Sequence, residues 1–338
     1  MRNEVNMKKI YDESKIVTVF FAADEGYLPY LEVALKSLSE HSSIEYQYDI
    51  KILSNGFSRQ SVMRLREGVK ENIAVSAVDM TGRIAPIKKA LSLRLRDYYS
   101  DTIYYRLFIP SLFKNLKKAV YLDSDVILLD DVAKLFNTAL CGKILGAVTD
   151  ESVISVPIFS RYVKEYVGTR TAKRYFNSGV LVMDLDGFRR EKIEERFLRL
   201  LLSYNFKTVA PDQDYLNFLC RGRVKYLSGG WNKHAIVGRD IPDSELHLVH
   251  FNMFNKPWKY SGVPYEEHFW HYADMTPSSE SLRAARSEYS DEKKTCDYKA
   301  AEKLLATARS IVENESPISE NSEFRGGYLQ SGVLVGAT

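Results

Sequence analysis

Short apolar runs alternate with segments of helical periodicity over the first two thirds of the chain. The run IVTVFFA at Ile16–Ala22 is apolar except for Thr18, which is typical of a strand buried on both faces. Residues 30–38 carry apolar side chains at the spacing of one helix face. The alternation continues with strands predicted at 48–53, 73–80, 119–122 and 144–148, and with helices predicted at 58–70 and 102–116, the latter continuous or broken at Pro110. This order predicts an α/β fold with a mostly parallel sheet between helices.

The last third of the chain has a less regular pattern. It predicts a strand at 180–185, an amphipathic helix at 191–204, a short helix at 212–219, a strand at 246–251 and helical structure within 281–314. Glycine and serine are frequent after Pro317, so we expect a mobile tail. The predicted organisation is a lead at 1–14, one domain at 15–275, a C-terminal helical extension at 276–316 and the tail at 317–338.

Composition excludes some classes of protein. The 338 residues carry a net charge of only +3, which argues against a dedicated nucleic-acid binder. Three cysteines, Cys141, Cys220 and Cys296, are far apart and have no metal-site spacing, which favours a reducing compartment. No stretch approaches the roughly 18 apolar residues of a membrane span, and charges are nearly balanced in 281–314. We therefore expect a cytoplasmic protein with no transmembrane segment and at most peripheral contact with the inner face of a membrane.

The strongest chemical signal is the sequence YLDSDV at 121–126. An apolar strand runs directly into Asp123 and Asp125, and residues i and i+2 of an extended chain point to the same side. Both carboxylates can therefore face one cation at the carboxyl end of a strand, where open α/β sheets bind ligands. Magnesium and manganese prefer such oxygen ligands. A pair of ordinary turn aspartates has the same pattern, so the motif alone leaves both interpretations open.

Five further segments place polar side chains at the ends of predicted elements. They are FFAADEGY at 20–27, YYRL at 104–107, FNSGVL at 176–181, DQD at 212–214 and HFNMFNKPW at 250–258. Each has an ordinary explanation as a cap, a turn or an aromatic packing face. Together with YLDSD, and in this order, they resemble glycosyltransferase family 8, the retaining transferases that include the lipooligosaccharide galactosyltransferases and glycogenin. The resemblance extends from about residue 16 to residue 270 and does not cover the C-terminal helix and tail.

The resemblance implies a single GT-A-type, Rossmann-like domain that binds a nucleotide sugar. It implies that Asp123, Asp125 and His250 hold Mn²⁺, or Mg²⁺, and that the ion bridges the diphosphate of a UDP-sugar. Lys256 would contact the same phosphates.

The resemblance also assigns the two ends of the donor. Asp24 would accept a hydrogen bond from the uracil or the ribose, Tyr27 would stack on the uracil, and Ser124 would lie near the ribose. Four side chains would surround the donor sugar: Arg106, Asn177, Asp212 and Gln213. Two positions depart from the family pattern. Gly26 replaces an asparagine that often assists base recognition, and Met253 stands where some relatives have a glycine near phosphate.

The function implied is transfer of a hexose, glucose or galactose, from a UDP-sugar to a glycan or glycolipid acceptor. A haloacid dehalogenase-type phosphatase stays open as an alternative, because it also has Asp-x-Asp after an apolar strand, although near its N-terminus. A non-catalytic module that binds sugar nucleotides is the third possibility. The residues place no carboxylate as an obvious nucleophile opposite the leaving group, and this favours a front-face route to retention in which the leaving phosphate takes the proton of the acceptor.

Overall fold

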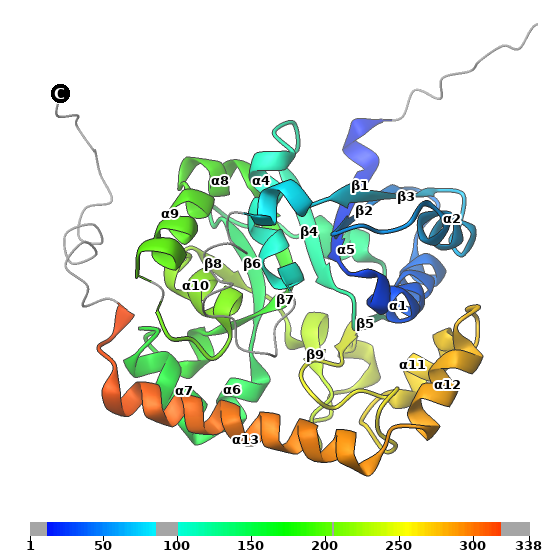
Figure 1. Ribbon diagram of the computed structural model, residues 1–338. Coiled ribbons are helices and arrows are strands. Elements are labelled where there is room, and N and C mark those ends of the chain that lie inside the picture. Colours follow the sequence, from blue (N-terminus) through cyan, green and yellow to red (C-terminus); the bar gives the residue numbers. More distant parts are fainter. Residues whose placement is uncertain (1–11, 86–100, 205, 319–338) are drawn as a thin grey trace, which may run out of the picture.

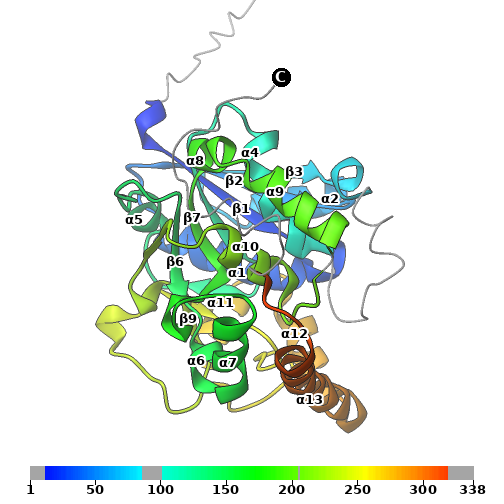
Figure 2. The ribbon, with the colours of Figure 1, turned by 90° about the vertical axis from the view of Figure 1, so that its left-hand side faces the viewer.

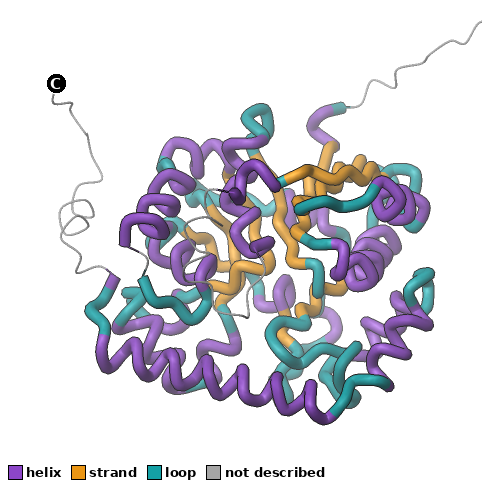
Figure 3. Tube along the Cα trace, viewed as in Figure 1, coloured by secondary structure: helices purple, strands orange, loops and turns teal. Residues whose placement is uncertain are grey.

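A seven-stranded sheet forms the centre of the computed structural model, which describes residues 12–85, 101–204 and 206–318 (Figures 1 and 3). The strand order is β3-β2-β1-β4-β7-β6-β8. In this sheet β7 runs antiparallel to both of its neighbours, and the other paired strands are parallel. The mostly parallel sheet predicted from the sequence is therefore confirmed. The strands are β1 (Ile16–Ala22), β2 (Gln47–Ser54), β3 (Ile73–Asp79), β4 (Lys118–Asp123), β6 (Leu145–Thr149), β7 (Phe176–Asp184) and β8 (Val224–Tyr226).

Helices cover both faces of this sheet, and this explains why the sequence of β1 is almost entirely apolar. Val17, Val19 and Phe21 pack into one hydrophobic cluster with α1, whereas Phe20 points into a second cluster on the other face. The first face carries α1 (Leu28–His41), α2 (Arg59–Glu67) and α5 (Val132–Phe136). The second face carries α8 (Leu185–Arg190), α9 (Ile193–Arg199) and α10 (Pro211–Leu219).

A three-stranded sheet extends the molecule below the carboxyl end of β4. Its order is β5-β10-β9, formed by β5 (Val126–Leu128), β10 (Leu248–His250) and β9 (Lys233–His234). β5 begins one residue after Asp125 and pairs antiparallel with β10, so that Val126 lies opposite His250. This pairing brings two segments together that are more than 100 residues apart in the chain.

The C-terminal part consists of helices that extend along one side of the molecule. They are α11 (Glu266–Ala273), α12 (Ser279–Ser287) and α13 (Asp291–Asn314). α13 packs its buried Ala308 and Ile311 near α7 (Pro157–Glu165), beside which it lies in Figure 2. Within the residues that the structure describes, no helix is long and apolar enough to cross a membrane.

Several predicted helices differ from the observed elements. Residues 101–112 are helical without interruption, as a 3₁₀ helix, η3 (Asp101–Phe108), followed directly by one α-helical turn, α4 (Ile109–Leu112), so Pro110 is tolerated, but the helix changes type before it and ends before residue 116. Proline is tolerated in the first turn because the amide there has no intrahelical partner. The helix predicted at 191–204 begins at Ile193, after Lys192 in the left-handed region (φ 52°), and becomes a π-helix at Leu200–Tyr204. α6 (Glu151–Ser155) and α7 were not predicted.

The ends of the chain were predicted as a lead at 1–14 and a mobile tail at 317–338. Residues 1–11 and 319–338 lie outside the described part of the chain. Between them, the helical structure predicted within 281–314 is present as α12 and α13, which are separated at residues 288–290.

Candidate active site

Asp123, Asp125 and His250 meet where β4 leads into β5. Nε2 of His250 lies 3.2 Å from Oδ1 of Asp125 and 3.8 Å from Oδ2 of Asp123. One potential ligand atom from each residue lies within 4.8 Å of the others. Two carboxylates and one imidazole are a donor set that suits Mn²⁺ or Mg²⁺. The geometry thus brings together the three residues for which the resemblance implied metal binding.

A buried network of side-chain amides surrounds this cluster. Oδ2 of Asp150 accepts from Nδ2 of Asn177 and from Nε2 of Gln213, both at 3.0 Å. Oδ1 of Asn177 then accepts from Nδ2 of Asn232 at 2.9 Å. Because the amide nitrogen of Asn177 donates to a carboxylate oxygen, Asp150 determines which way the amide of Asn177 points. The orientation of Asn177 in turn determines that of Asn232.

Asn232 holds His250 in the form that can bind a metal. With its Nδ2 committed to Asn177, Asn232 presents Oδ1 to Nδ1 of His250 at a distance of 2.9 Å. Nδ1 therefore carries the proton, and Nε2 is left with its lone pair directed at Asp125. The carboxylate of Asp150 thus sets the tautomer of His250 through two amides.

Gly179 of β7 allows the close approach of β7 to the metal cluster. A Cβ atom at this position would lie 2.3 Å from Cε1 of His250 and 2.6 Å from Oδ2 of Asp123. Any larger residue would displace one of the candidate ligands. The glycine of the FNSG segment is therefore explained by space rather than by backbone conformation.

Arg106 connects the metal cluster to the inner end of the site. Its Nη2 donates to Oδ1 of Asp123 at 3.0 Å, and its Nε lies 3.4 Å from Oδ2 of Asp212. The hydroxyl of Tyr121 donates to the same Asp123 oxygen at 2.9 Å. One oxygen of Asp123 is thereby held, and the other oxygen faces His250.

Asp212 and Gln213 lie in the first turn of α10 and contact β7. Oγ of Ser178 donates to Oδ2 of Asp212 at 3.0 Å, and the backbone amide of Ser178 donates to Oε1 of Gln213 at 2.8 Å. Burial raises the pKa of Asp212, although Arg106 acts in the opposite direction. These contacts place both residues in the wall of the site.

Asp214, the second aspartate of the DQD segment, has a structural role. It is fully buried and accepts hydrogen bonds at 2.7–3.0 Å from the hydroxyls of Tyr162 and Tyr175 and from the amides of Val209 and Ala210. Burial raises its pKa to about 6 despite these donors. Because both of its oxygens are engaged, Asp214 is a poor candidate for a nucleophile.

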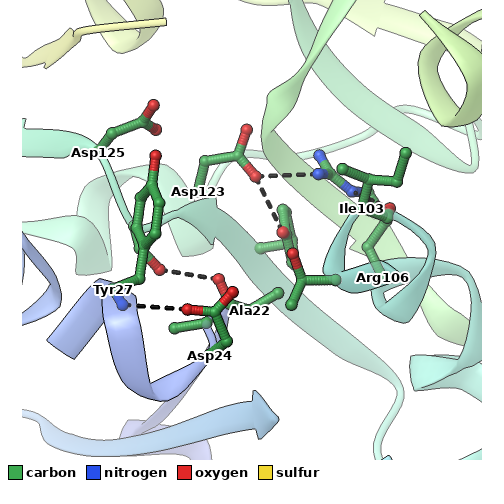
Figure 4. A pocket seen from close by; sticks show the side chains of 11 residues that line it. Ala22, Asp24, Tyr27, Ile103, Arg106, Asp123 and Asp125 are labelled. Atoms are coloured by element: carbon green, nitrogen blue, oxygen red, sulfur yellow. Dashed lines mark hydrogen bonds and ion pairs between the residues drawn. The ribbon is translucent and has the colours of Figure 1, made fainter. Parts of the chain in front are cut away.

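One pocket of about 290 Å³ is lined by the residues implied for the uracil and the ribose, Asp24, Tyr27 and Ser124, but not by Lys256 (Figure 4). Oδ1 of Asp24 accepts from the amide of Tyr27 at 3.1 Å and caps the 3₁₀ turn Glu25–Tyr27 that leads into α1. Oγ of Ser124 donates to the carbonyl of Ala22 at 2.9 Å, which ties the end of β4 to that of β1. In Figure 4, Asp24 and Tyr27 lie on one side of the pocket and Arg106 on the other, with Asp123 between them.

A second pocket of about 210 Å³ lies on the other side of the metal cluster. Both pockets are lined by Ile103, Arg106, Asp123 and Asp125, so they join at the candidate metal ligands. The second pocket is also lined by the residues implied for the donor sugar, Asn177, Asp212 and Gln213, and by Asp150 and His250.

Lys256 contacts the metal cluster directly. Its ammonium group forms an ion pair with Asp125, donates to the carbonyl of Phe251 and lies 5.5 Å from the ring centroid of Trp258. Burial alone would raise the pKa of Asp125, but the ion pair with Lys256 holds it well below its usual range. The charge of Lys256 is thus buried beside the carboxylates, and only 6% of the residue is exposed.

Sequence reasoning missed Asp150, Asn232 and the role of Ser178. Asp150 follows the apolar strand β6, so the strand-end signal that identified Asp24 could have found it. Asn232 ends the short 3₁₀ turn Gly229–Asn232, whose sequence GGWN has no periodic pattern. His234 is buried beside His250, with ring centroids 5.6 Å apart, and burial lowers its pKa to about 4.

Comparisons with known proteins agree with this geometry. The model of the family described as glycosyl transferase family 8 matches residues 18–262. The lipopolysaccharide 1,2-glucosyltransferase of Escherichia coli strain K12 is 24% identical over 291 residues, which cover 81% of this chain and 82% of that protein. Glycosyltransferase GlyF of Streptococcus pneumoniae is 28% identical over 271 residues, 76% of this chain and 61% of that protein.

Two solved structures share the fold. Galactosyltransferase LgtC, in complex with donor and acceptor sugar analogues, has a TM-score of 0.59 at 24% identity, covering 80% of this chain and all of that one. The apo structure of the bifunctional glycosyltransferase WbbM has a TM-score of 0.70 at 22% identity, covering 82% of this chain and 53% of that one. The family match at 18–262 ends before α11, so α12 and α13 lie outside it.

Proposed function

Since the chain belongs to glycosyl transferase family 8 and is a glycosyltransferase, we propose that it transfers glucose or galactose from a UDP-sugar to a glycan acceptor with the help of one divalent cation. The observation that carries this proposal is the position of Asp123, Asp125 and His250 at the junction of two pockets. One pocket holds the residues implied for the nucleotide and the other those implied for the sugar. A donor laid across the junction would place its diphosphate at the three ligands.

The side chains at the junction fit a divalent metal. Oδ2 of Asp123, Oδ1 of Asp125 and Nε2 of His250 converge, and the tautomer of His250 leaves the required lone pair. A bound Mn²⁺ or Mg²⁺ would neutralise negative charge on the diphosphate as it leaves. Tyr121 and Arg106 hold Asp123 in place for this role.

The nucleotide would be oriented by the pocket on the β1 side. Asp24 would accept a hydrogen bond from the uracil or the ribose, Tyr27 would stack on the base and Ser124 would lie beside the ribose. Asp24 and Ser124 are both fixed by backbone hydrogen bonds, which favours a preformed site.

Lys256 would stabilise the charge that develops on the leaving diphosphate. Its ammonium group lies against Asp125, so it can reach both this carboxylate and a phosphate bound at the metal. A buried cation stabilises developing negative charge strongly because water does not screen it.

A front-face route accounts for retention with these residues. The bond between the anomeric carbon and the diphosphate breaks, the acceptor hydroxyl oxygen bonds to that carbon on the same face, and its proton moves to the leaving phosphate oxygen. Asp214 is engaged by four donors, and the amide of Gln213 is a weak nucleophile. Asp212, Gln213, Asn177 and Arg106 would bind the sugar, and the carboxylate of Asp212 would stabilise its oxocarbenium-like state.

The acceptor we propose is a bacterial surface glycan such as lipopolysaccharide, because the Escherichia coli relative is named for that activity. Action in the cytoplasm, with at most peripheral contact with the inner face of the membrane, belongs to the same proposal. No specific observation favours a phosphatase or a non-catalytic module.

A panel of UDP-sugars tests the proposal. We expect slow hydrolysis of UDP-glucose or UDP-galactose that needs Mn²⁺ or Mg²⁺ and stops in EDTA. NMR of the released sugar should show the anomeric configuration of the donor. Metal-independent hydrolysis, or release of the opposite anomer, contradicts the mechanism, and release of phosphate from simple phosphomonoesters would favour the phosphatase.

A further inference from the structure

Helix α13 is fixed at both ends and passes the outer side of the site. Near its start, Asp297 accepts hydrogen bonds from Nζ of Lys259 at 3.1 Å and from the hydroxyls of Tyr260 and Tyr289 at 3.0 and 2.8 Å. Near its end, Ala308 and Ile311 are buried near α7. Figure 1 shows the helix running along the lower edge of the molecule from α12 to α7.

The middle of α13 lines a row of connected pockets. Leu304 lines the sugar pocket described above, and it shares a neighbouring pocket of about 320 Å³ with Ala300, Lys303 and Thr307. Tyr298 lines the next pocket, of about 350 Å³, together with Asp297 and Ala301. From residue 297 to residue 307 the helix rises about 15 Å, which is longer than one hexose ring.

The wall opposite α13 joins these pockets to the reaction centre. Met253 lines both the sugar pocket and the neighbouring pocket, and Phe254 lines both the neighbouring and the outermost pocket. These shared lining residues connect the sugar pocket at the candidate metal site, through the neighbouring pocket, to the pocket of Tyr298. We call this surface, between residues 253–254 and α13, the outer groove.

Exposed apolar side chains gather along the outer groove. In the described part of the chain, seven large apolar side chains are strongly exposed, and Val237, Met253 and Tyr298 are three of them, at 78%, 51% and 70%. All three line the pockets of this row. Their neighbours there include polar side chains such as Asn255, Ser261 and Thr208. Apolar faces mixed with hydroxyl and amide groups suit a sugar, whose ring has a C–H face and hydroxyl edges, better than a lipid chain.

We propose that the outer groove binds the acceptor as an oligosaccharide, with Tyr298 as a stacking platform for a sugar unit behind the one that is glycosylated. The inference rests on the proposed function, because it takes the sugar pocket as the place where transfer occurs. It goes beyond that function in naming an acceptor of at least two sugar units and a specificity residue outside the family match. The helix that carries Tyr298 is then part of the enzyme's acceptor site.

Binding of sugars of increasing length tests the proposal. Titrations would use the full chain with UDP and Mn²⁺ and two series as probes: glucose, maltose and maltotriose, and galactose, lactose and globotriose. In at least one series the affinity of the wild-type protein should rise with length. Tyr298→Ala should weaken binding of the longest sugar about three- to tenfold, and Tyr298→Phe should restore it because stacking needs the ring and not the hydroxyl.

Ile44→Ala is the matched control, because Ile44 is 89% exposed and lines none of these pockets. It should bind the longest sugar as the wild type does. Affinity that does not rise with length in either series, or equal binding by wild type and Tyr298→Ala, overturns the proposal. Thermal stabilisation of the wild type by UDP with Mn²⁺ separates the outer groove from the proposed function. If UDP stabilises the protein but sugar length has no effect on affinity, only the proposal for the groove is wrong. If UDP does not stabilise the protein, the proposed function itself fails.

Discussion

At the centre of the site buried polar side chains hold one another in place, whereas along the outer groove the side chains of α13 are partly exposed and mainly apolar. Asp150, Asn177 and Asn232 form a chain of hydrogen bonds that ends at His250, all within the family match. Tyr298 and Leu304 lie on a helix beyond that match. A saturated network tolerates little change, because each lost partner leaves a buried polar group unpaired. In a helix fixed at its two ends, the residues between them can be substituted with little loss of stability.

The largest effect is expected at the metal ligands. Asp125→Asn should lower metal-dependent turnover by at least about 1000-fold, because a neutral amide is a weak ligand for a hard cation. Asparagine is a better test than alanine because its amide oxygen can still accept a hydrogen bond from the buried Lys256, which alanine would leave without this partner.

The control for this variant is Asp243→Asn, an exposed aspartate in the turn Asp243–Glu245. Both proteins should keep the circular dichroism spectrum of the wild type. Turnover of Asp125→Asn near that of the wild type in saturating Mn²⁺ contradicts the metal assignment.

A variant of Lys256 should show whether catalysis at the centre of the site depends on the charge of this side chain or on its shape. Lys256→Met keeps the aliphatic stem and removes the charge, so kcat should fall on the order of 100-fold, as for a lost charge-stabilising donor. Affinity for Mn²⁺ should not fall, because the variant removes a cation from beside Asp125. Lys134→Met, at a surface ion pair, is the control. An unchanged kcat in Lys256→Met would refute the phosphate role.

A variant of Asn232 should show whether the amide network affects the affinity of the site for the metal. Asn232→Leu removes the acceptor for Nδ1 of His250 and frees the ring to take the wrong tautomer, so the Kd for Mn²⁺ should rise about 10- to 100-fold. Electron paramagnetic resonance of free Mn²⁺ measures this directly. Asn137→Leu, in which the amide contacts only the surface Tyr46 in the described structure, serves as the control. Equal Mn²⁺ affinity in wild type and Asn232→Leu would show that the network does not affect metal binding by His250.

The smallest effect is expected on the α13 side. Leu304→Ala removes apolar surface from the wall shared by the sugar pocket and the outer groove, so the acceptor KM should rise about three- to tenfold. Steady-state kinetics with the longest sugar that the enzyme accepts gives this value. Glu302→Ala, two residues earlier and absent from the lining of these pockets, is the control. If the acceptor KM is unchanged, the helix does not contact the acceptor.

The parts of the fold that follow from local pattern could be predicted. β1 and β4 are apolar because they are buried on both faces, and the sequence places Asp123 and Asp125 at the end of β4 without any knowledge of tertiary structure. The short strands β5 and β9 lack such a pattern. They form because they pair with β10, and no pattern in the neighbouring sequence predicts this pairing.

The site was only partly predictable, for a related reason. Asn232 and Asp150 act through hydrogen bonds to residues 18 to 63 positions away, and no spacing along the chain encodes these contacts. The resemblance implied a phosphate contact for Lys256 but not its ion pair with Asp125, which depends on the packing of the loop after β10.

Thermal unfolding with UDP and Mn²⁺ tests the central claim most directly, namely that Asp123, Asp125 and His250 join one metal to the donor diphosphate. At UDP concentrations of about 100 times its Kd, the folded state should gain about 2.7 kcal/mol and the Tm should rise. The account predicts this rise with UDP and Mn²⁺ together, its loss in EDTA and its loss in Asp125→Asn. An equal rise in EDTA, or in Asp125→Asn, would contradict the account.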